Sequence, residues 1–165
     1  GNSLYPRKKE TAQRALCLFF PRIQAMAYST GSHSIFHHRY HIVWAPKYRF
    51  KVLHGDVRDR VRTIIKQVCA EMGVTIISGV LSRDHVHMFV EIPPSIAVSD
   101  FVRRAKGRSS RKIQQEFEHI RKRYWGQRFW ARGYFSTTSG NITDTVILNY
   151  LNNHIPPPPG FSPAT

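Results

Sequence analysis

Residues 85–92 alternate apolar and polar side chains, and no other feature of the chain constrains its fold as strongly. The even positions would face a core, because alternate residues of a strand share a face: Val86, Met88, Val90 and Ile92. The odd positions would share the opposite face: His85, His87, Phe89 and Glu91. Two imidazoles side by side on a rigid strand form half of a divalent-metal site, so His85 and His87 are candidate metal ligands.

The segments around this strand predict an antiparallel sheet interrupted by helices. Strands are expected at 36–44, 74–81, 85–92 and 133–138, with a short additional strand at 48–53. Helices are expected from Asp56 to Met72, from Ser99 to about His119, and from Thr143 to the proline run at 156–159. The order β-α-β-β-α-β-α predicts an α+β, ferredoxin-like split βαβ fold. Its two main helices would cover one face of the sheet, and an added C-terminal helix would carry Tyr150. The other face would stay open and carry His85 and His87.

The last expected helix places a hydroxyl and a third imidazole together. Tyr150 and His154 are spaced i, i+4, so they lie one above the other on one side of a helix. They could supply a nucleophile and a third metal ligand. Two structural alternatives stay open: Tyr150 packs on the sheet, and His154 interacts with the helix dipole. Asp84 could orient a ligand histidine or only form the turn before the strand.

The charge of the chain points to a polyanionic partner. The formal net charge is +15, and residues 103–132 hold eleven basic residues against two glutamates. A nucleic-acid backbone explains this excess better than an anionic membrane, because no long apolar face accompanies the charges. The expected phosphate-binding residues lie on the helix after Ser99: Arg103, Arg104, Lys106, Arg108 and Arg111. The aromatic residues between 125 and 135 could stack on bases, with at least half of them expected in the core. The early histidines at 37, 38 and 41 are expected at the surface or facing DNA.

Length and composition predict one folded domain. Residues 1–25 differ from the rest and are interpreted as a tag remnant or an upstream region, residues 26–155 as the domain, and residues 156–165 as a proline-rich tail. No apolar stretch is long enough for a transmembrane helix. Cys17 and Cys69 suggest no disulfide framework, which is typical of the reducing cytoplasm.

Three segments together resemble a known family. The pair His85-Val86-His87 followed by a late Tyr150, the segment Tyr40–Arg49 and the segment Phe129–Phe135 resemble the HUH (His-hydrophobic-His) single-tyrosine transposases of IS200-like insertion sequences. The resemblance runs from about Met26 to His154. One position departs from the family pattern, since the residue four after the tyrosine is commonly Gln there and is His154 here.

The resemblance implies a specific activity. It implies a transposase that cleaves and rejoins single-stranded DNA at insertion-sequence ends through a 5′-phosphotyrosine on Tyr150. It implies a Mg²⁺ or Mn²⁺ ion held by His85 and His87, with His154 in the position of the third ligand. The partners would be single-stranded DNA, including hairpin ends, and a second subunit whose Tyr150 serves the histidine pair of the first. Two alternatives remain: a domesticated HUH nuclease, and a non-catalytic nucleic-acid-binding protein with a ferredoxin-like sheet.

Overall fold

The computed structural model describes residues 29–30, 35–36, 38–138 and 140–161. The expected N-terminal extension, residues 1–25, lies outside these residues. A four-stranded antiparallel sheet has the order β4-β5-β3-β6. Its strands are β3 (Arg39–Trp44), β4 (Thr75–Leu81), β5 (Val86–Glu91) and β6 (Phe135–Thr137). A separate hairpin pairs β1 (Ser29–Thr30) with β2 (Ile35–Phe36). The order of strands and helices confirms the ferredoxin-like split βαβ fold.

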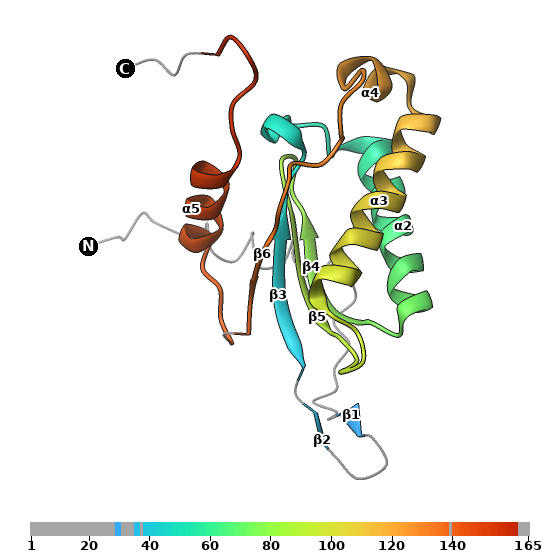
Figure 1. Cartoon of the computed structure of the whole chain (residues 1–165), viewed down its shortest axis with the longest axis vertical. Coiled ribbons are helices and arrows are strands. Elements are labelled where there is room, and N and C mark those ends of the chain that lie inside the picture. Colours follow the sequence, from blue (N-terminus) through green and yellow to red (C-terminus); the bar gives the residue numbers. More distant parts are fainter. Residues whose placement is uncertain (1–28, 31–34, 37, 139, 162–165) are drawn as a thin grey trace, which may run out of the picture.

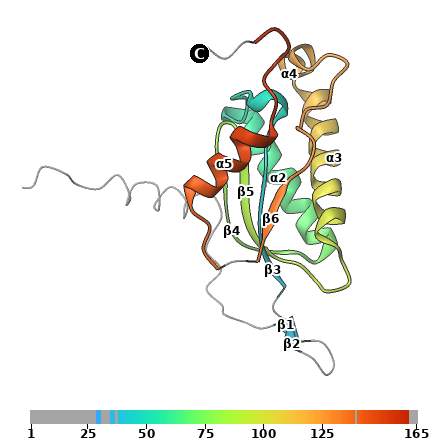
Figure 2. The ribbon, with the colours of Figure 1, turned by 60° about the vertical axis from the view of Figure 1, so that its left-hand side comes forward.

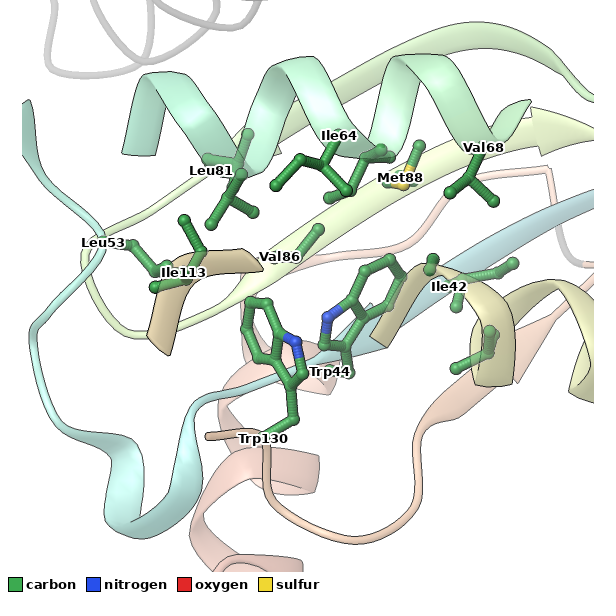
Figure 3. Close-up of a cluster of buried hydrophobic side chains, with 14 of the residues drawn as sticks. Ile42, Trp44, Leu53, Ile64, Val68, Leu81, Val86, Met88, Ile113 and Trp130 are labelled. Carbon is green, nitrogen blue, oxygen red and sulfur yellow. The ribbon is translucent and has the colours of Figure 1, made fainter. Parts of the chain in front are cut away.

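Two helices cover one face of the sheet (Figure 1). They are α2 (Gly55–Met72) and α3 (Val98–Glu116). The apolar residues of α2 recur at helical spacing. They are buried against the even positions of β5, the face that the alternation predicted to be in the core. Figure 3 shows this core, in which Ile64 and Val68 of α2 lie over Met88 of β5. Gly73 ends α2 in the left-handed conformation at φ 69°, a position that favours glycine.

The last helix covers part of the other face. Helix α5 (Asp144–His154) lies across the sheet from α2 and α3 (Figure 2). Ile147 and Leu151 are buried against Val43 and Ala45 of the β3 region in a second, smaller core. The expectation that this face stays open is therefore wrong over β3 and β6. Thr143 is the N-cap of α5 as predicted, and its side chain accepts a hydrogen bond from Val146 N at 3.4 Å.

Two other expectations differ from the structure. No strand forms at 48–53; residues Lys47–Arg49 form a 3₁₀ turn, and positive φ angles at Tyr48 (62°) and Arg49 (54°) are incompatible with an extended strand. The expected single helix to residue 119 ends at Glu116, because Phe117 adopts an extended conformation. A short helix, α4 (Glu118–Arg123), follows it.

Helices start slightly earlier than the sequence predicted. The N-caps are His54 for α2 and Ala97 for α3, so Asp56 and Ser99 lie within the first turns. Among the described residues, no helix combines the length and the apolar character needed to cross a bilayer.

Candidate active site and nucleic-acid interface

His85 is held by a carboxylate at the start of β5. Its Nδ1 lies 2.8 Å from Oδ1 of Asp84, so Nδ1 donates its proton to the carboxylate, and in the neutral ring the lone pair is then on Nε2. Arg49 donates to the other oxygen of Asp84 from Nε (3.2 Å) and Nη2 (3.0 Å). These contacts, led by the bond to His85, lower the pKa of Asp84 to about 2. A carboxylate–histidine pair of this kind is the usual way in which a metal-binding imidazole is oriented.

His87 contacts another histidine. Its Nε2 lies 3.1 Å from Nδ1 of His41 on the neighbouring strand β3. His41 is only 7% exposed, and its ring stacks on Phe89 with a centroid separation of 4.3 Å. Burial, followed by the nearby His41 and His85, lowers the pKa of His87 to about 4. His87 is therefore a neutral imidazole near pH 7, the form that binds metals.

The buried position of His41 corrects its expected place at the surface. The alternation of β3 puts His41 and Val43 on the same face, but the contact with His87 depends on the pairing of β3 with β5. Sequence reasoning missed this residue because the register between two strands 46 residues apart is not visible in the sequence.

Tyr150 and His154 stack on α5, as their spacing predicted. Their ring centroids are 5.1 Å apart with an interplanar angle of 24°, and Nδ1 of His154 lies 3.1 Å from the carbonyl oxygen of Tyr150. Tyr150 also contacts Phe135 of β6 at a centroid distance of 5.7 Å. Burial raises the pKa of Tyr150 above its ordinary value, so its side chain is a phenol at neutral pH.

The docked helix turns Tyr150 away from the strand histidines. Oδ1 of Asn152 accepts a hydrogen bond from Nη1 of Arg49 at 2.6 Å, which places this side of α5 next to the Asp84–His85 pair. Residues two apart on a helix point about 200° from each other. Tyr150 therefore faces β6 while Asn152 faces Arg49.

The strand histidines and the helix residues do not form one site in this chain. Within the part of the chain that the structure describes, no three His, Cys, Asp or Glu side chains are arranged to hold a metal ion. His85 and His87 fit the nitrogen-ligand half of such a site. His154 is exposed and lies on the α5 surface with Tyr150.

Arg49 is a second residue that sequence reasoning left without a role. It joins Asp84 to Asn152, and it stands in a left-handed backbone conformation that costs free energy in a non-glycine residue. Strained residues of this kind cluster at functional sites. The only signal in the sequence was that Arg49 closes one of the segments that resemble the transposase family.

A groove about 800 Å³ in volume runs between α3 and the segment 128–134. Six cationic side chains line it: Arg103, Lys106, Arg111, Arg121, Arg128 and Arg132. None of its described lining residues is acidic. A groove of one sign of charge concentrates a polyanion, and phosphates are the anions that arginine binds best.

The expected phosphate-binding residues divide between two surfaces. Lys106 and Arg111 line the groove, Arg104 lines a second hollow beside Glu71, and Arg103 lines both. Arg108 is paired with the same glutamate, Nη1 to Oε1, at 2.6 Å.

Lys106 has a structural role at the groove floor. Its Nζ donates to the carbonyl oxygens of Ala131 and Gly133, each at 2.8 Å. Burial, followed by the nearby Arg128, lowers the pKa of Lys106 to about 8. The groove also contains Arg121, Arg128 and Arg132, which were counted in the basic excess but not assigned a contact. They were missed because the fold, not the sequence order, brings them beside α3.

Comparison with known proteins identifies the family. The family model described as "Transposase IS200 like" matches residues 34–154. The chain belongs to the IS200-like transposase family. The family inferred from His85-Val86-His87 and Tyr150 is therefore confirmed. Transposases of this family are DNA-cleaving enzymes.

Individual relatives agree with this assignment. The chain is 36% identical over 124 residues to the transposase for insertion sequence element IS200 of Salmonella typhimurium, covering 75% of this chain and 81% of the relative. It is 30% identical over 123 residues to the ISDra2 transposase TnpA of Deinococcus radiodurans, covering 74% and 88%.

Solved structures confirm the fold. A chain from Deinococcus radiodurans described as a transposase is similar with a TM-score of 0.70 and 28% identity, covering 77% of this chain and 98% of that one. A REP-associated tyrosine transposase bound to a REP hairpin has a TM-score of 0.50 at 15% identity, covering 76% and 72%. At that identity the second structure supports the fold alone.

Proposed function

We propose that this IS200-like transposase cleaves and rejoins single-stranded DNA with Tyr150 as its nucleophile. The observation that carries the proposal is the oriented pair His85–Asp84 beside His87, on the sheet face on which the tyrosine helix docks. Attack of the Tyr150 oxygen on a phosphodiester forms a 5′-phosphotyrosine and releases the 3′-oxygen of the preceding nucleotide. The phenol loses its proton, and the leaving oxygen gains one. Rejoining reverses these steps, so the bond energy is conserved.

The strand histidines are the proposed metal ligands. His85 offers Nε2 because Asp84 occupies Nδ1, and His87 is neutral. Mg²⁺ or Mn²⁺ bound there would neutralise phosphate charge and stabilise the departing alkoxide. His154 is proposed as the third ligand. This role requires α5 to approach a histidine pair in an orientation different from the docked one.

We further propose that two subunits share each active site. In a single chain Tyr150 faces β6, whereas Asn152 on the other side of α5 contacts Arg49, which holds the Asp84–His85 pair. A composite site in a homodimer removes this mismatch, because the helix of one subunit then serves the sheet of the other. Strand joining also requires two cut ends held at once.

The cationic groove is the proposed contact for the DNA backbone. Its six cations, with no acidic residue among the described lining, fit a phosphate chain. Hairpin ends are an expected form of the substrate, and the structural relative with a bound REP hairpin is consistent with this. A non-catalytic binder that stacks bases on the sheet would need exposed aromatic rings, but His41 stacks on Phe89 and Tyr150 packs on Phe135.

The test is covalent trapping of labelled DNA. The protein is incubated with single-stranded DNA carrying candidate element ends and with Mg²⁺ or Mn²⁺, and a denaturing gel shows the adduct. We expect Tyr150→Phe to reduce cleavage below about a thousandth of the wild-type rate, because the nucleophilic oxygen is lost. DNA binding, measured by fluorescence anisotropy, should stay within about two-fold of wild type because the groove is unchanged.

Tyr40→Phe is the matched control, since it removes a tyrosine hydroxyl from β3 that belongs neither to α5 nor to the groove lining. Wild-type adduct levels in Tyr150→Phe would show that another residue is the nucleophile.

A further inference from the structure

Trp125 is exposed to an extent that folding does not require. It lies two residues after the end of α4 and is 78% exposed, whereas the other two tryptophans, Trp44 and Trp130, are 0% and 4% exposed. Those two pack edge to face in the core at a centroid distance of 6.1 Å (Figure 3). A single exposed apolar side chain is common at protein surfaces. Its function must therefore be argued from what holds and surrounds it.

The turn that presents Trp125 is anchored at both ends. Tyr124 is fully buried, and its carbonyl oxygen accepts from Gln127 N at 2.7 Å. The side chain of Gln127 accepts from the hydroxyl of Tyr48 at 3.1 Å. Gly126 turns the chain at φ 67°, a left-handed conformation that favours glycine. The indole thus projects from a fixed turn, which lowers the entropy lost when a ligand packs on it.

Cations that line the groove lie close to Trp125 along the chain. Arg121 and Arg128, four residues before and three residues after the indole, both belong to the groove lining. In the described part of the chain neither has a carboxylate partner. In contrast, Arg123 packs over the ring of Phe50 at 4.1 Å. Trp125 therefore lies within four residues, along the chain, of two arginines that line the groove.

We infer that Trp125 stacks on an unpaired base of the DNA strand whose phosphates occupy the groove. The inference rests on the proposed function and extends it from the backbone to the bases. An indole face recognises any base, but only a base that is not covered by pairing and stacking in a duplex. The combination of a fixed aromatic ring and a cationic groove is the usual construction of a single-strand binding surface. The occupant is thus an unpaired nucleotide adjacent to the groove-bound phosphates.

Trp44 is fully buried, but Trp130 lines the groove, so the part of the tryptophan-emission change on DNA binding that is lost in Trp125→Phe is the part that reports on Trp125. The full chain, without added metal, is titrated with oligothymidylate of about 12 nucleotides and with an abasic oligomer of equal length and charge. Anisotropy of a label on the DNA measures binding independently of the indole. We expect oligothymidylate to quench the emission, and the abasic strand to bind more weakly without quenching.

Variants separate stacking from charge. Trp125→Ala should weaken oligothymidylate binding by about five-fold to about a hundred-fold, leave abasic binding unchanged, and keep the wild-type salt dependence. Trp125→Phe should retain most of the affinity. Arg128→Ala should instead weaken the binding of both oligomers. The slope of the affinity against salt concentration should fall by about one phosphate contact. Phe161→Ala is the matched control, because Phe161 is 60% exposed and does not line the groove.

A failure of the stacking inference can be distinguished from a failure of the proposed groove contact. If anisotropy shows binding, but oligothymidylate causes the same emission change in wild type and Trp125→Phe and Trp125→Ala binds it with wild-type affinity, the stacking inference is overturned and the proposed function stands. If neither oligomer binds by anisotropy, the proposed groove contact fails and the inference fails with it.

Discussion

At the residue scale, Asp84 resolves an alternative that the sequence left open. It lies in the turn before β5, and it also accepts the Nδ1 proton of His85 while holding two nitrogens of Arg49. A side chain that only formed the turn would not need an ionised carboxylate aimed at an imidazole. The low pKa of Asp84, about 2, keeps this carboxylate charged at physiological pH.

Asp84 is therefore expected to affect metal binding without contacting the metal. We predict that Asp84→Ala weakens Mn²⁺ binding by about 10- to 100-fold, because His85 loses the acceptor that fixes its tautomer and ring orientation. Asp84→Asn retains an acceptor oxygen, so its Mn²⁺ affinity should lie between those of the wild type and Asp84→Ala. Isothermal titration calorimetry of the full chain measures the affinity. Asp100→Asn serves as the control, since Asp100 pairs with Arg103 on exposed α3. Equal affinities in all variants would show that Asp84 only forms the turn.

How well the residues could be predicted depends on how local their determinants are. The alternation in β5 predicted its buried face, and Thr143 predicted the start of α5, because both signals lie within a few residues. The contact of His41 with His87 depends on strand register, which is set by the whole sheet. The role of Arg49 depends on a left-handed turn that no residue type in the segment indicates. The direction of Tyr150 depends on how α5 docks, which its spacing to His154 does not determine.

At the element scale, one hydrogen bond joins α3 to the segment that forms the other wall of the groove. Oγ of Ser109 accepts from Nε1 of Trp130 at 2.9 Å and donates to the carbonyl of Ala105 at 2.6 Å. Both side chains are buried, at 0% and 4% exposure. Lys106 adds a second link to the same segment through Ala131. The position of the groove walls thus rests on a few polar contacts in an apolar setting.

We predict that Ser109→Ala lowers the free energy of unfolding by about 1–3 kcal/mol, because the indole N–H of Trp130 would remain buried without an acceptor. Urea denaturation should show a lower midpoint with an unchanged slope. Ser110→Ala is the matched control, because the neighbouring hydroxyl is only partly buried and accepts a long bond of 3.4 Å from Gln114. A midpoint equal to wild type in Ser109→Ala would mean that the groove wall shifts to satisfy the indole elsewhere.

At the scale of the whole molecule, the position of α5 sets where Tyr150 lies relative to the sheet. The second core that holds α5 is small, and it buries Ile147, Leu151 and Ile155 against the β3 side of the sheet. The helix follows Gly140 and Asn141, which can turn without the constraint of a strand. A helix joined by such a link can dock on its own sheet or on that of a second subunit, and exchange of one element is a low-cost route to a dimer.

The shared-site proposal predicts that two inactive proteins restore each other. Tyr150→Phe lacks the nucleophile, and His85→Ala lacks a strand ligand, so each homodimer should be inactive. A mixed dimer with exchanged helices contains one site with both groups intact and one site with neither. Random mixing makes half of the dimers mixed, so about a quarter of the wild-type sites should be active. Adduct formation with labelled single-stranded DNA measures the recovery, and differently tagged subunits establish that mixed dimers form. If each site is instead built within one chain, every chain in the mixture lacks one essential group, and no adduct appears even though mixed dimers are present.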